Sequence, residues 1–329
     1  MPFNELNSVE HFIIHQLSGV NLNNGDSDES LESYRWIYKS SNQINRGIKE
    51  VLVEDEVSEA LIRLNPEITA NPDLADEVIY KLRTIMISVN QVGLVRANEE
   101  FCEWLSGNKT MPFGKNNKHV PVQLIDFEDP SNNNYTITNQ FQVHHLETKI
   151  PDIILLINGI PVVVGEAKTP VRPSISWLDG ADEIHNIYEN SVPQLFVPNI
   201  LSFATEGKEL FYGAVRAPLE HWAPWRIEND ENVITNSLGL TEVGEQLIDL
   251  LSPDRLLDIL KNFSLFTTNK KRQRIKVICR FQQYEGTNKI VERVINGNVK
   301  KGLIWHFQGS GKSLLMVFAA QKLRRAAQL

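Results

Sequence analysis

Residues 151–168 read PDIILLINGIPVVVGEAK, two hydrophobic runs that carry charged residues at their outer ends. Asp152 opens the first run, and Glu166 and Lys168 close the second. Because alternate residues of a β-strand face the same way, Glu166 and Lys168 share one face. Carboxylates and lysines are rarely buried unless they are paired or bind a metal. The pattern therefore predicts a hairpin with a polar site at the rim of a sheet.

The turn between the two runs decides whether Asp152 reaches that face. A two-residue turn would place Asp152 opposite Gly165, on the wrong face. A three-residue loop that begins at Ile157 would place Asp152 diagonal to Glu166 instead. Gly159 suits the left-handed position that such a loop needs. We therefore predict a three-residue loop or an equivalent bulge.

These residue types suit hydrolysis of a phosphodiester by a bound metal ion. Asp152 and Glu166 offer the oxygen ligands that Mg²⁺ prefers, and a bound metal lowers the pKa of a water molecule. Lys168 is a compact charge that can position the water or neutralise the oxyanion. Glu10, on a helix predicted over residues 8–17, is a candidate additional ligand or neighbour of the ligands. The structural alternative is a surface ion pair between Glu166 and Lys168.

A second motif lies near the end of the chain, where residues 306–313 read HFQGSGKS. It matches the phosphate-loop pattern G-x-x-x-x-G-K-[ST] except that His306 replaces the first glycine. A strand predicted over residues 302–307 and a helix from Ser313 to about residue 327 give the expected context. The predicted phosphate-binding residues, with Lys312 on the β- and γ-phosphates and Ser313 on Mg²⁺, are Gly309, Ser310, Gly311, Lys312 and Ser313. The alternative is a Gly/Ser turn that happens to precede a helix.

Gln282 and Gln283 precede this loop, and a glutamine amide can donate to and accept from one adenine edge. We predict that Gln283 is the adenine reader. Together the loop and this glutamine predict ATP as a second ligand, beside Mg²⁺.

The periodicity of the remaining chain predicts an α/β fold. Helices are expected over residues 50–65, 72–88, 181–190 and 254–266, and strands over residues 122–127, 135–143, 195–203 and 210–215. We place a domain boundary near residue 265, which separates a first domain (1–265) from the start of a second (266–329). Its entry, residues 277–294, is expected to be rich in helix. The basic run at residues 270–276 is interpreted either as a phosphate-backbone contact or as a solvated linker.

The charge, the cysteine content and the lengths of the apolar runs limit the classes of protein to which the chain can belong. The formal net charge is −8, which excludes a uniformly basic surface but not a local DNA-binding patch. The two cysteines predict no disulfide framework, and the N-terminus lacks the pattern of a secretory signal. No apolar run is long enough to span a bilayer. A cytoplasmic protein is the natural expectation.

With these motifs in hand, the chain resembles the N-terminal part of the restriction (R) subunit of type I restriction-modification enzymes. The resemblance rests on Asp152, Glu166 and Lys168 in a PD…(D/E)xK pattern, on residues 124–126, 133–134 and 139–140, and on the run from residue 304 to residue 313. It implies a RecB-like PD-(D/E)xK nuclease core, a mixed sheet flanked by helices, followed by the first part of a RecA-like helicase domain.

The resemblance also implies a function. Such a subunit is an ATP-dependent, type I site-specific deoxyribonuclease that uses Mg²⁺, translocates double-stranded DNA and joins methyltransferase and specificity subunits. The acidic ATPase box of such a motor is expected beyond Leu329. The family often carries Gln-x-x-x-Tyr after the site; here Tyr188 is a candidate DNA contact, but Ile184 stands where the glutamine is expected. Glu183 and His185 are possible substitutes. The competing readings are a stand-alone RecB-like repair nuclease-helicase and a degenerate nuclease domain that serves for docking.

Overall fold

The computed structural model describes residues 9–23, 35–171, 174–227, 239–297, 301–305 and 308–326. Its first elements are α1 (His11–Ser18), β1 (Ile37–Tyr38), η2 (Ser41–Gln43), α2 (Glu54–Leu64), α3 (Pro66–Ala70), α4 (Leu74–Ile87), α5 (Val89–Val92), α6 (Leu94–Leu105), β2 (Thr110–Gly114), η3 (Lys115–Asn117) and β3 (Lys118–Pro121). The elements around the predicted site are η4 (Pro130–Asn132), β4 (Tyr135–Asn139), β5 (Val143–His144), β6 (Thr148–Lys149), β7 (Ile153–Ile157), β8 (Ile160–Ala167), α7 (Trp177–Asp182), the π-helical segment η5 (Glu183–Tyr188) and α8 (Glu189–Ser191). The chain continues with η6 (Pro193–Phe196), β9 (Leu201–Thr205), β10 (Leu210–Gly213), η7 (Leu219–His221), β11 (Ala223–Pro224), α9 (Gly239–Leu250), α10 (Pro253–Asn262), β12 (Ser264–Thr268), β13 (Arg274–Ile278), α11 (Phe281–Asn296) and α12 (Lys312–Arg325).

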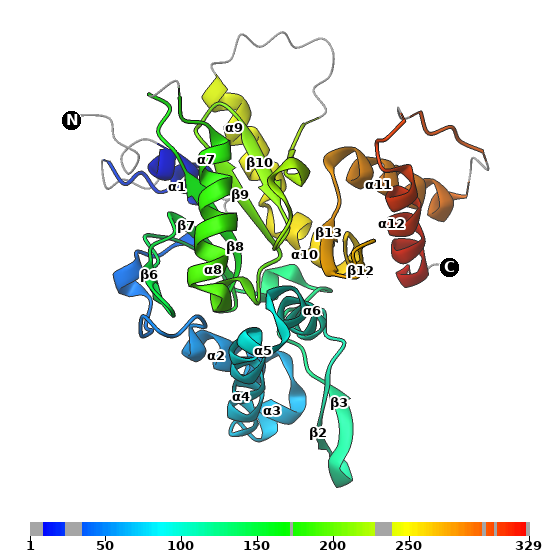
Figure 1. Ribbon diagram of the computed structural model, residues 1–329. Helices are drawn as coiled ribbons and strands as arrows, with labels where there is room; N and C mark the ends of the chain where they lie inside the picture. Colours follow the sequence, from blue (N-terminus) through cyan, green and yellow to red (C-terminus); the bar gives the residue numbers. More distant parts are fainter. Residues whose placement is uncertain are drawn as a thin grey trace.

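A seven-stranded mixed sheet forms the centre of the described structure, in the order β1-β4-β7-β8-β9-β10-β11. The pairs β1–β4 and β8–β9 are parallel, and the other neighbouring pairs are antiparallel. Helix α7 covers β8 and β9 in front of the sheet, α9 and α10 lie behind it, and α2 to α6 form a helical group beneath it (Figure 1). The observed fold is therefore mixed α/β, a central mixed sheet flanked by helices.

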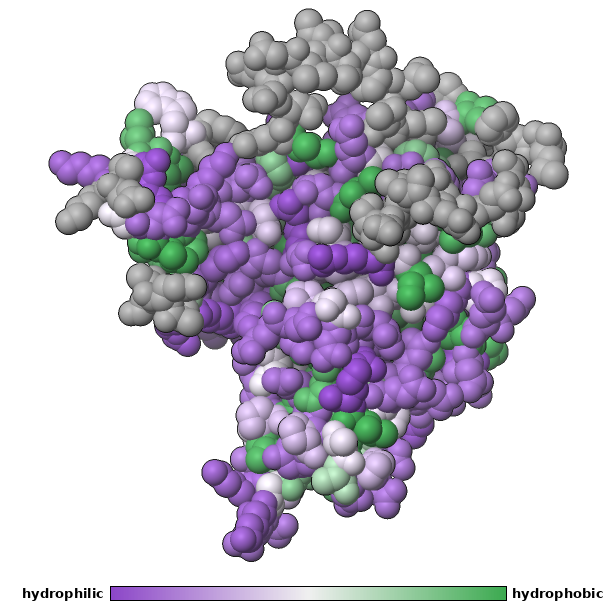
Figure 2. Space-filling view, turned by 180° about the vertical axis from the view of Figure 1, so that it is seen from behind, coloured by the Kyte–Doolittle hydropathy of each residue, from purple (hydrophilic) through white to green (hydrophobic). Residues whose placement is uncertain are grey.

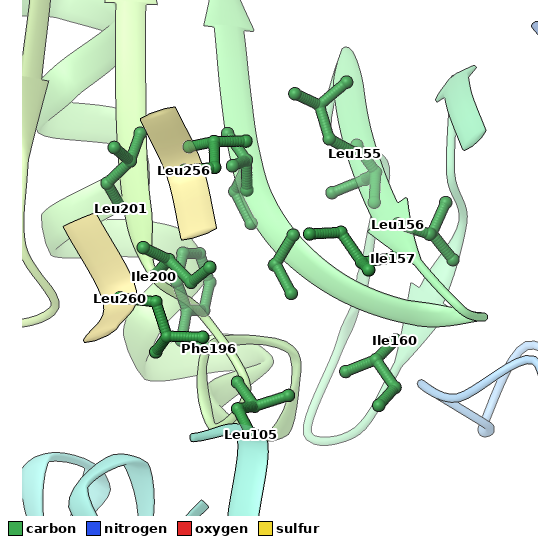
Figure 3. Packing of buried hydrophobic residues seen from close by; sticks show 14 of the residues in the cluster. Leu105, Leu155, Leu156, Ile157, Ile160, Phe196, Ile200, Leu201, Leu256 and Leu260 are labelled. Atoms are coloured by element: carbon green, nitrogen blue, oxygen red, sulfur yellow. The ribbon is translucent and has the colours of Figure 1, made fainter. Parts of the chain in front are cut away.

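Strands β7 and β8 are the hydrophobic centre of the molecule, because every residue in both strands is buried. A strand covered on both faces needs a nearly continuous apolar sequence, which explains the unbroken hydrophobic run. Figure 3 shows Leu256 and Leu260 of α10, Leu201 of β9 and Phe196 of η6 among the buried side chains of one hydrophobic cluster. On the face shown in Figure 2 the surface is mainly hydrophilic, with hydrophobic residues in separate small patches.

Most predicted helices are confirmed, with shifted ends. The first is α1, which begins at His11 with Glu10 as its N-cap; Ser8 lies outside the described residues. The helix predicted over residues 181–190 is present, but its middle is π-helical. The helix predicted over residues 254–266 ends at Asn262, because the chain turns there into β12. The helix-rich entry predicted over residues 277–294 begins as β13 and becomes α11.

Two predicted strands fail, and three are shortened or shifted. Residues 122–127 form no strand although Val122 and Leu124 are buried, because the backbone there bonds to asparagine side chains. Gln123 N–H donates to Asn65 at 2.8 Å, and Asp126 N–H donates to Asn133 at 2.8 Å. Residues 302–305, the described part of the strand predicted over 302–307, also form no strand. The strands predicted over 135–143 and 210–215 shorten to β4 and β10, and the strand predicted over 195–203 is displaced to β9.

The basic run at residues 270–276 is a hairpin rather than a linker. It joins β12 to β13, which pair in antiparallel register from Ser264–Ile278 to Thr268–Arg274. Arg274 forms an ion pair with Glu99, and Lys276 is buried, donating to the carbonyl of Asn199 at 2.6 Å. The linker interpretation is therefore wrong, since the run belongs to a paired hairpin, although residues 270–273 at its turn are exposed to solvent.

Candidate nuclease site and phosphate loop

The β7–β8 hairpin has a two-residue turn, so the predicted three-residue loop is wrong. Asn158 and Gly159 form the turn with φ values of 51° and 77°, and Ile157 pairs with Ile160. A side chain at Gly159 is excluded, because its Cβ would lie 2.6 Å from the carbonyl oxygen of Val53. Asn158 tolerates the left-handed conformation, and its buried amide donates to the carbonyl of Leu124 at 2.9 Å. The turn is thus fixed by its surroundings.

The equivalent bulge is present a few residues from the turn. Leu155 pairs with Val163 and Leu156 pairs with Pro161, which leaves Val162 without a partner. One extra residue changes the face on which every later side chain of that strand lies. Beyond the bulge Ile153 pairs with Gly165, which sets Asp152 opposite Glu166. The bulge therefore brings the two carboxylates to one face, as the sequence required.

Asp152 is fastened to the end of β8. Its Oδ2 accepts a hydrogen bond of 2.9 Å from the backbone N–H of Ala167, and its Oδ1 accepts one of 3.5 Å from Gln140. Burial is the main reason that the pKa of Asp152 lies above its usual value, and the Ala167 bond and the Lys168 charge only partly offset it. The carboxylate is thus oriented by the backbone of β8.

Glu166 and Lys168 form a buried ion pair with an unusual feature. Glu166 is 3% exposed, and its Oε1 lies 2.8 Å from the ammonium of Lys168. The second oxygen, Oε2, is buried and has no hydrogen-bond partner in the described part of the chain. Burial, followed by the Asp152 charge, raises the pKa of Glu166 well above its usual value. Burial alone would lower the pKa of Lys168, but the charges and hydrogen bonds of Glu166 and Glu183 together outweigh it and raise that pKa.

Glu10 joins the site from the N-terminus of α1. It is 1% exposed and accepts hydrogen bonds from Asn139 at 3.0 Å and from Gln140 at 2.6 Å. Gln140, held at φ 51°, therefore contacts both Glu10 and Asp152. Burial, opposed by the Asn139 bond and reinforced by the Asp152 charge, raises the pKa of Glu10 to about 7. The structure thus places Glu10 next to Asp152 through Gln140, while its role as a ligand or neighbour of the ligands stays a prediction. The bridging contact of Gln140 was not predicted.

Glu183 and Tyr188 reach the site from the π-helical segment. The Lys168 ammonium lies 2.6 Å from Glu183 Oε2, and the Tyr188 hydroxyl donates to Glu183 Oε1 at 3.0 Å. Ile184, the residue in the expected glutamine position, is fully buried in the core. His185 instead lies 3.5 Å from Glu189. Of the two possible substitutes, the structure brings Glu183 to the site.

This donor set fits a divalent cation. Glu10, Asp152 and Glu166 are carboxylates brought together in a buried place, and each has a raised pKa. A buried carboxylate oxygen without a partner, such as Glu166 Oε2, is costly unless something positive approaches it. In the described residues no group of three His, Cys, Asp or Glu side chains has metal-binding geometry as it stands. Asp152 and Glu166 would therefore supply two ligands, and water or substrate the others, as is usual for Mg²⁺.

The phosphate-loop motif adopts a loop that leads into α12. Gly309 and Gly311 have φ values of 87° and 81°, Ser310 is 1% exposed, and Lys312 is the first residue of the helix. Ser313 follows in the first turn and is exposed. Such an arrangement directs backbone N–H groups at an anion near a helix N-terminus. His306 and Phe307 lie outside the described residues.

Gln283 is buried beneath the loop, which departs from the expected adenine-reading position. Its Oε1 accepts from the backbone N–H of Arg280 at 2.9 Å, at the start of α11. Its Nε2 lies 3.4 Å and 3.2 Å from the carbonyl oxygens of Ser310 and Gly311. Both ends of the amide therefore contact this chain, and Gln283 joins the start of α11 to the loop.

Taken together, the fold and the site define a mixed α/β protein with a buried Asp…Glu-x-Lys centre on a bulged hairpin and a glycine-rich loop before a later helix. The chain belongs to the family described as type I restriction enzyme R protein N terminus, whose model matches residues 3–221. A second model, the SWI2/SNF2 ATPase, matches residues 282–329. No helix in the described segments is both long enough and apolar enough to cross a membrane.

Curated relatives agree with this family. The chain is 30% identical to the type I restriction enzyme HindI endonuclease subunit of Haemophilus influenzae, over 94% of this chain and 30% of that protein. It is 28% identical to the putative type I restriction enzyme MjaVIIIP endonuclease subunit of Methanocaldococcus jannaschii, over 74% of this chain and 24% of the relative. The chain thus spans less than a third of the length of these relatives. Their names do not favour the alternative of a stand-alone repair nuclease.

Proposed function

We propose that this chain is the N-terminal part of the restriction subunit of a type I restriction-modification enzyme, and that it cleaves double-stranded DNA in an Mg²⁺-dependent reaction. The observation that carries the proposal is the placement of Asp152 opposite Glu166, with Lys168 2.8 Å from Glu166, at the end of a bulged hairpin. A surface ion pair would be exposed, whereas Glu166 is 3% exposed.

In the proposed mechanism two carboxylates would hold the metal, and the Lys168 ammonium would orient the reacting groups. Asp152 and Glu166 ligate Mg²⁺, and the Ala167 N–H fixes the orientation of the Asp152 carboxylate. When bound, Mg²⁺ lowers the pKa of a bound water molecule and stabilises the charge that develops on the phosphate. Lys168 orients the attacking water or the scissile phosphate through its ammonium protons. Glu10, through Gln140, limits the movement of Asp152.

The second half of the proposal concerns ATP. The backbone of residues 309–312 surrounds the phosphates, Lys312 contacts the β- and γ-phosphates, and Ser313 ligates the accompanying Mg²⁺. We propose that residues 1–265 form a RecB-like nuclease domain and that residues 266–329 begin a RecA-like motor domain. That motor would couple ATP hydrolysis to DNA translocation in a complex with methyltransferase and specificity subunits. Tyr188, 4% exposed, would act through Glu183 rather than as a direct DNA contact.

The decisive test compares three variants of the full-length subunit in the reconstituted complex. Asp152→Ala and Lys168→Ala are expected to abolish DNA cleavage and leave ATP hydrolysis intact. Lys312→Ala is expected to abolish ATP hydrolysis and translocation while leaving binding of divalent metal at the nuclease site intact. Cleavage that survives both nuclease-site substitutions would show that the hairpin is structural. ATP hydrolysis that survives Lys312→Ala would refute the loop assignment.

A further inference from the structure

Lys168 lies between two carboxylates that come from different elements. Its ammonium is 2.8 Å from Glu166 on β8 and 2.6 Å from Glu183 on the π-helical segment η5. Glu183 is itself held by the Tyr188 hydroxyl at 3.0 Å. Burial pushes the pKa of Glu183 upward, but the Lys168 hydrogen bond and charge outweigh it and keep the carboxyl ionised. Lys168 therefore has a second anionic partner that belongs to no strand of the hairpin.

The π-helical turn makes this contact possible. Glu183 precedes Tyr188 by five residues, and in an α-helix residues five apart lie about 140° apart around the axis. In η5 the backbone N–H of Glu189 bonds instead to the carbonyl of Ile184, five residues earlier. A turn of this kind inserts one extra residue and brings positions five apart onto the same side. Glu183 and Tyr188 can consequently face Lys168 together, while Ile184 remains in the core.

A second partner for Lys168 has a mechanistic consequence. A divalent cation at Asp152 and Glu166 would compete with Lys168 for the Glu166 carboxylate. If Glu166 were the only partner, its ligation to the metal would leave the Lys168 ammonium buried without a counter-charge, which is costly. Glu183 removes that conflict, because Lys168 can stay on Glu183 while Glu166 turns to the cation.

We infer that Glu183 is a positioning residue for Lys168: it retains the ammonium when Glu166 ligates the metal, and the π-helical turn places it there. The inference rests on the proposed nuclease function and deepens it. It assigns to Glu183 the role of the glutamine in the Gln-x-x-x-Tyr pattern, although Ile184 stands at the position that the spacing predicts. It also explains the position of Tyr188, because its hydroxyl donates a 3.0 Å hydrogen bond that orients the Glu183 carboxylate.

The test uses the full-length subunit in its complex with DNA and the partner subunits. Glu183→Ala is expected to reduce cleavage ~10- to 100-fold, as is typical when a group that orients a metal-site residue is removed. Glu183→Gln keeps an acceptor for Lys168 but not the counter-charge, so it is expected to restore only part of the rate. Asp182→Asn is the matched control, because Asp182 is the exposed neighbouring carboxylate and contacts Asn186. ATP hydrolysis should be unchanged in all three variants.

Two further readouts separate positioning from a merely structural role. The charged groups that face Lys168 are Glu166 and Asp152 from the hairpin and Glu183 from η5, with the Tyr188 hydroxyl beside them. Glu183→Ala should lower kcat for cleavage and leave the KM for DNA unchanged, because the substitution acts on the position of Lys168 and not on the binding of DNA. Titration calorimetry with Mn²⁺ should show weaker metal binding in Glu183→Ala, by ~10-fold or more.

The outcomes distinguish this inference from the proposed function. Cleavage that survives Lys168→Ala overturns both. Cleavage that is lost in Lys168→Ala but unchanged in kcat in Glu183→Ala overturns the inference alone. If thermal unfolding shows that Glu183→Ala does not fold, Glu183→Gln decides, because an unchanged cleavage rate together with unchanged Mn²⁺ affinity in that variant would equally overturn it.

Discussion

The carboxylate of Asp152 accepts a 2.9 Å hydrogen bond from the backbone N–H of Ala167, which fastens the start of β7 to the end of β8. Ala167 stands between Glu166 and Lys168, so this one bond ties the first acidic residue to the segment that carries the other two groups. Its geometry depends on register, since only strands paired as Ile153–Gly165 bring these ends together. The register of the hairpin is therefore the feature most open to mutational test.

Insertion of one alanine after Val162 should inactivate the site. With the two-residue turn and the bulge kept, the insertion moves the outer part of β8 by one position, which puts Asp152 opposite Gly165. We expect cleavage by the full-length complex to fall by ~100-fold or more, because even small misplacement of catalytic groups is costly. Deletion of Val162 is the comparison, because removal of the unpaired residue leaves Ile153 paired with Gly165 and Asp152 opposite Glu166. Equal activity of the insertion variant and the unaltered chain would contradict the register argument.

Gly165 should not accept a side chain. A Cβ at this position would lie 2.2 Å from the Phe203 ring, and Phe203 is fully buried. We expect Gly165→Ala to lower the free energy of unfolding of the 329-residue chain by about 1–3 kcal/mol, the usual cost of overpacking. Gly47→Ala is the matched control, because the nearest atom to a Cβ there lies at 3.5 Å, on the flexible side chain of Glu50. Denaturant unfolding of both variants measures the difference.

Glu10 should make the stability of the metal-free chain depend on pH. Burial raises its pKa from an ordinary value of 4.5 to about 7, so the folded state binds this proton more tightly than the unfolded state. The folded chain is therefore favoured at low pH, and that stability is lost as the pH rises from about 4.5 to about 7. The loss is on the order of 3 kcal/mol. The difference between the unfolding curves of the unaltered chain and Glu10→Gln isolates it.

The same measurement with saturating Mg²⁺ tests the metal site without any cleavage assay. A cation that binds the ionised carboxylates stabilises the folded state at high pH, so the pH dependence assigned to Glu10 should shrink. Identical unfolding curves with and without Mg²⁺ at pH 8 would count against a metal site here.

Gln283 either supports the phosphate loop or reads the adenine base, and a substitution distinguishes these two roles. If it supports the phosphate loop, Gln283→Ala should weaken binding of ATP and GTP alike, because the substitution removes contacts to the backbone of Ser310 and Gly311. The expected cost is about 1 kcal/mol, the contribution of a typical hydrogen bond. If it reads adenine, only the preference for ATP over GTP should vanish. Fluorescence titration of the full-length subunit, with Gln282→Ala as control, decides between the two.

The sequence predicts the centre of the site because its logic is local. Alternation along a strand puts Glu166 and Lys168 on one face whatever surrounds them. Asp152 can share that face only if the hairpin contains one extra residue, so the sequence alone predicts a one-residue irregularity. The same reasoning did not indicate whether the extra residue lies in the turn or at Val162. That choice depends on Asn158, whose amide contacts Leu124 and holds the turn at two residues.

The parts that escaped prediction depend on distant side chains. The strand expected over residues 122–127 has the right alternation, yet the amides of Asn65 and Asn133 take the backbone bonds that a neighbouring strand would have made. The π-helical turn of η5 leaves no mark on hydrophobic periodicity, so the spacing from Glu183 to Tyr188 looked one residue too long. Residues 139–140 belong to the family resemblance, but the contact of Gln140 with both Glu10 and Asp152 was not predicted, because it depends on a left-handed backbone at φ 51°.

The bulge at Val162 also bears on how such a hairpin can change in evolution. While the turn and the bulge are kept, insertions or deletions that change both strands by one residue leave the two carboxylates facing each other, whereas an unmatched single-residue change puts them on opposite faces. The hairpin can therefore grow or shrink in steps of two without loss of chemistry. What selection would preserve here is whether the spacing is odd or even, more than its actual length.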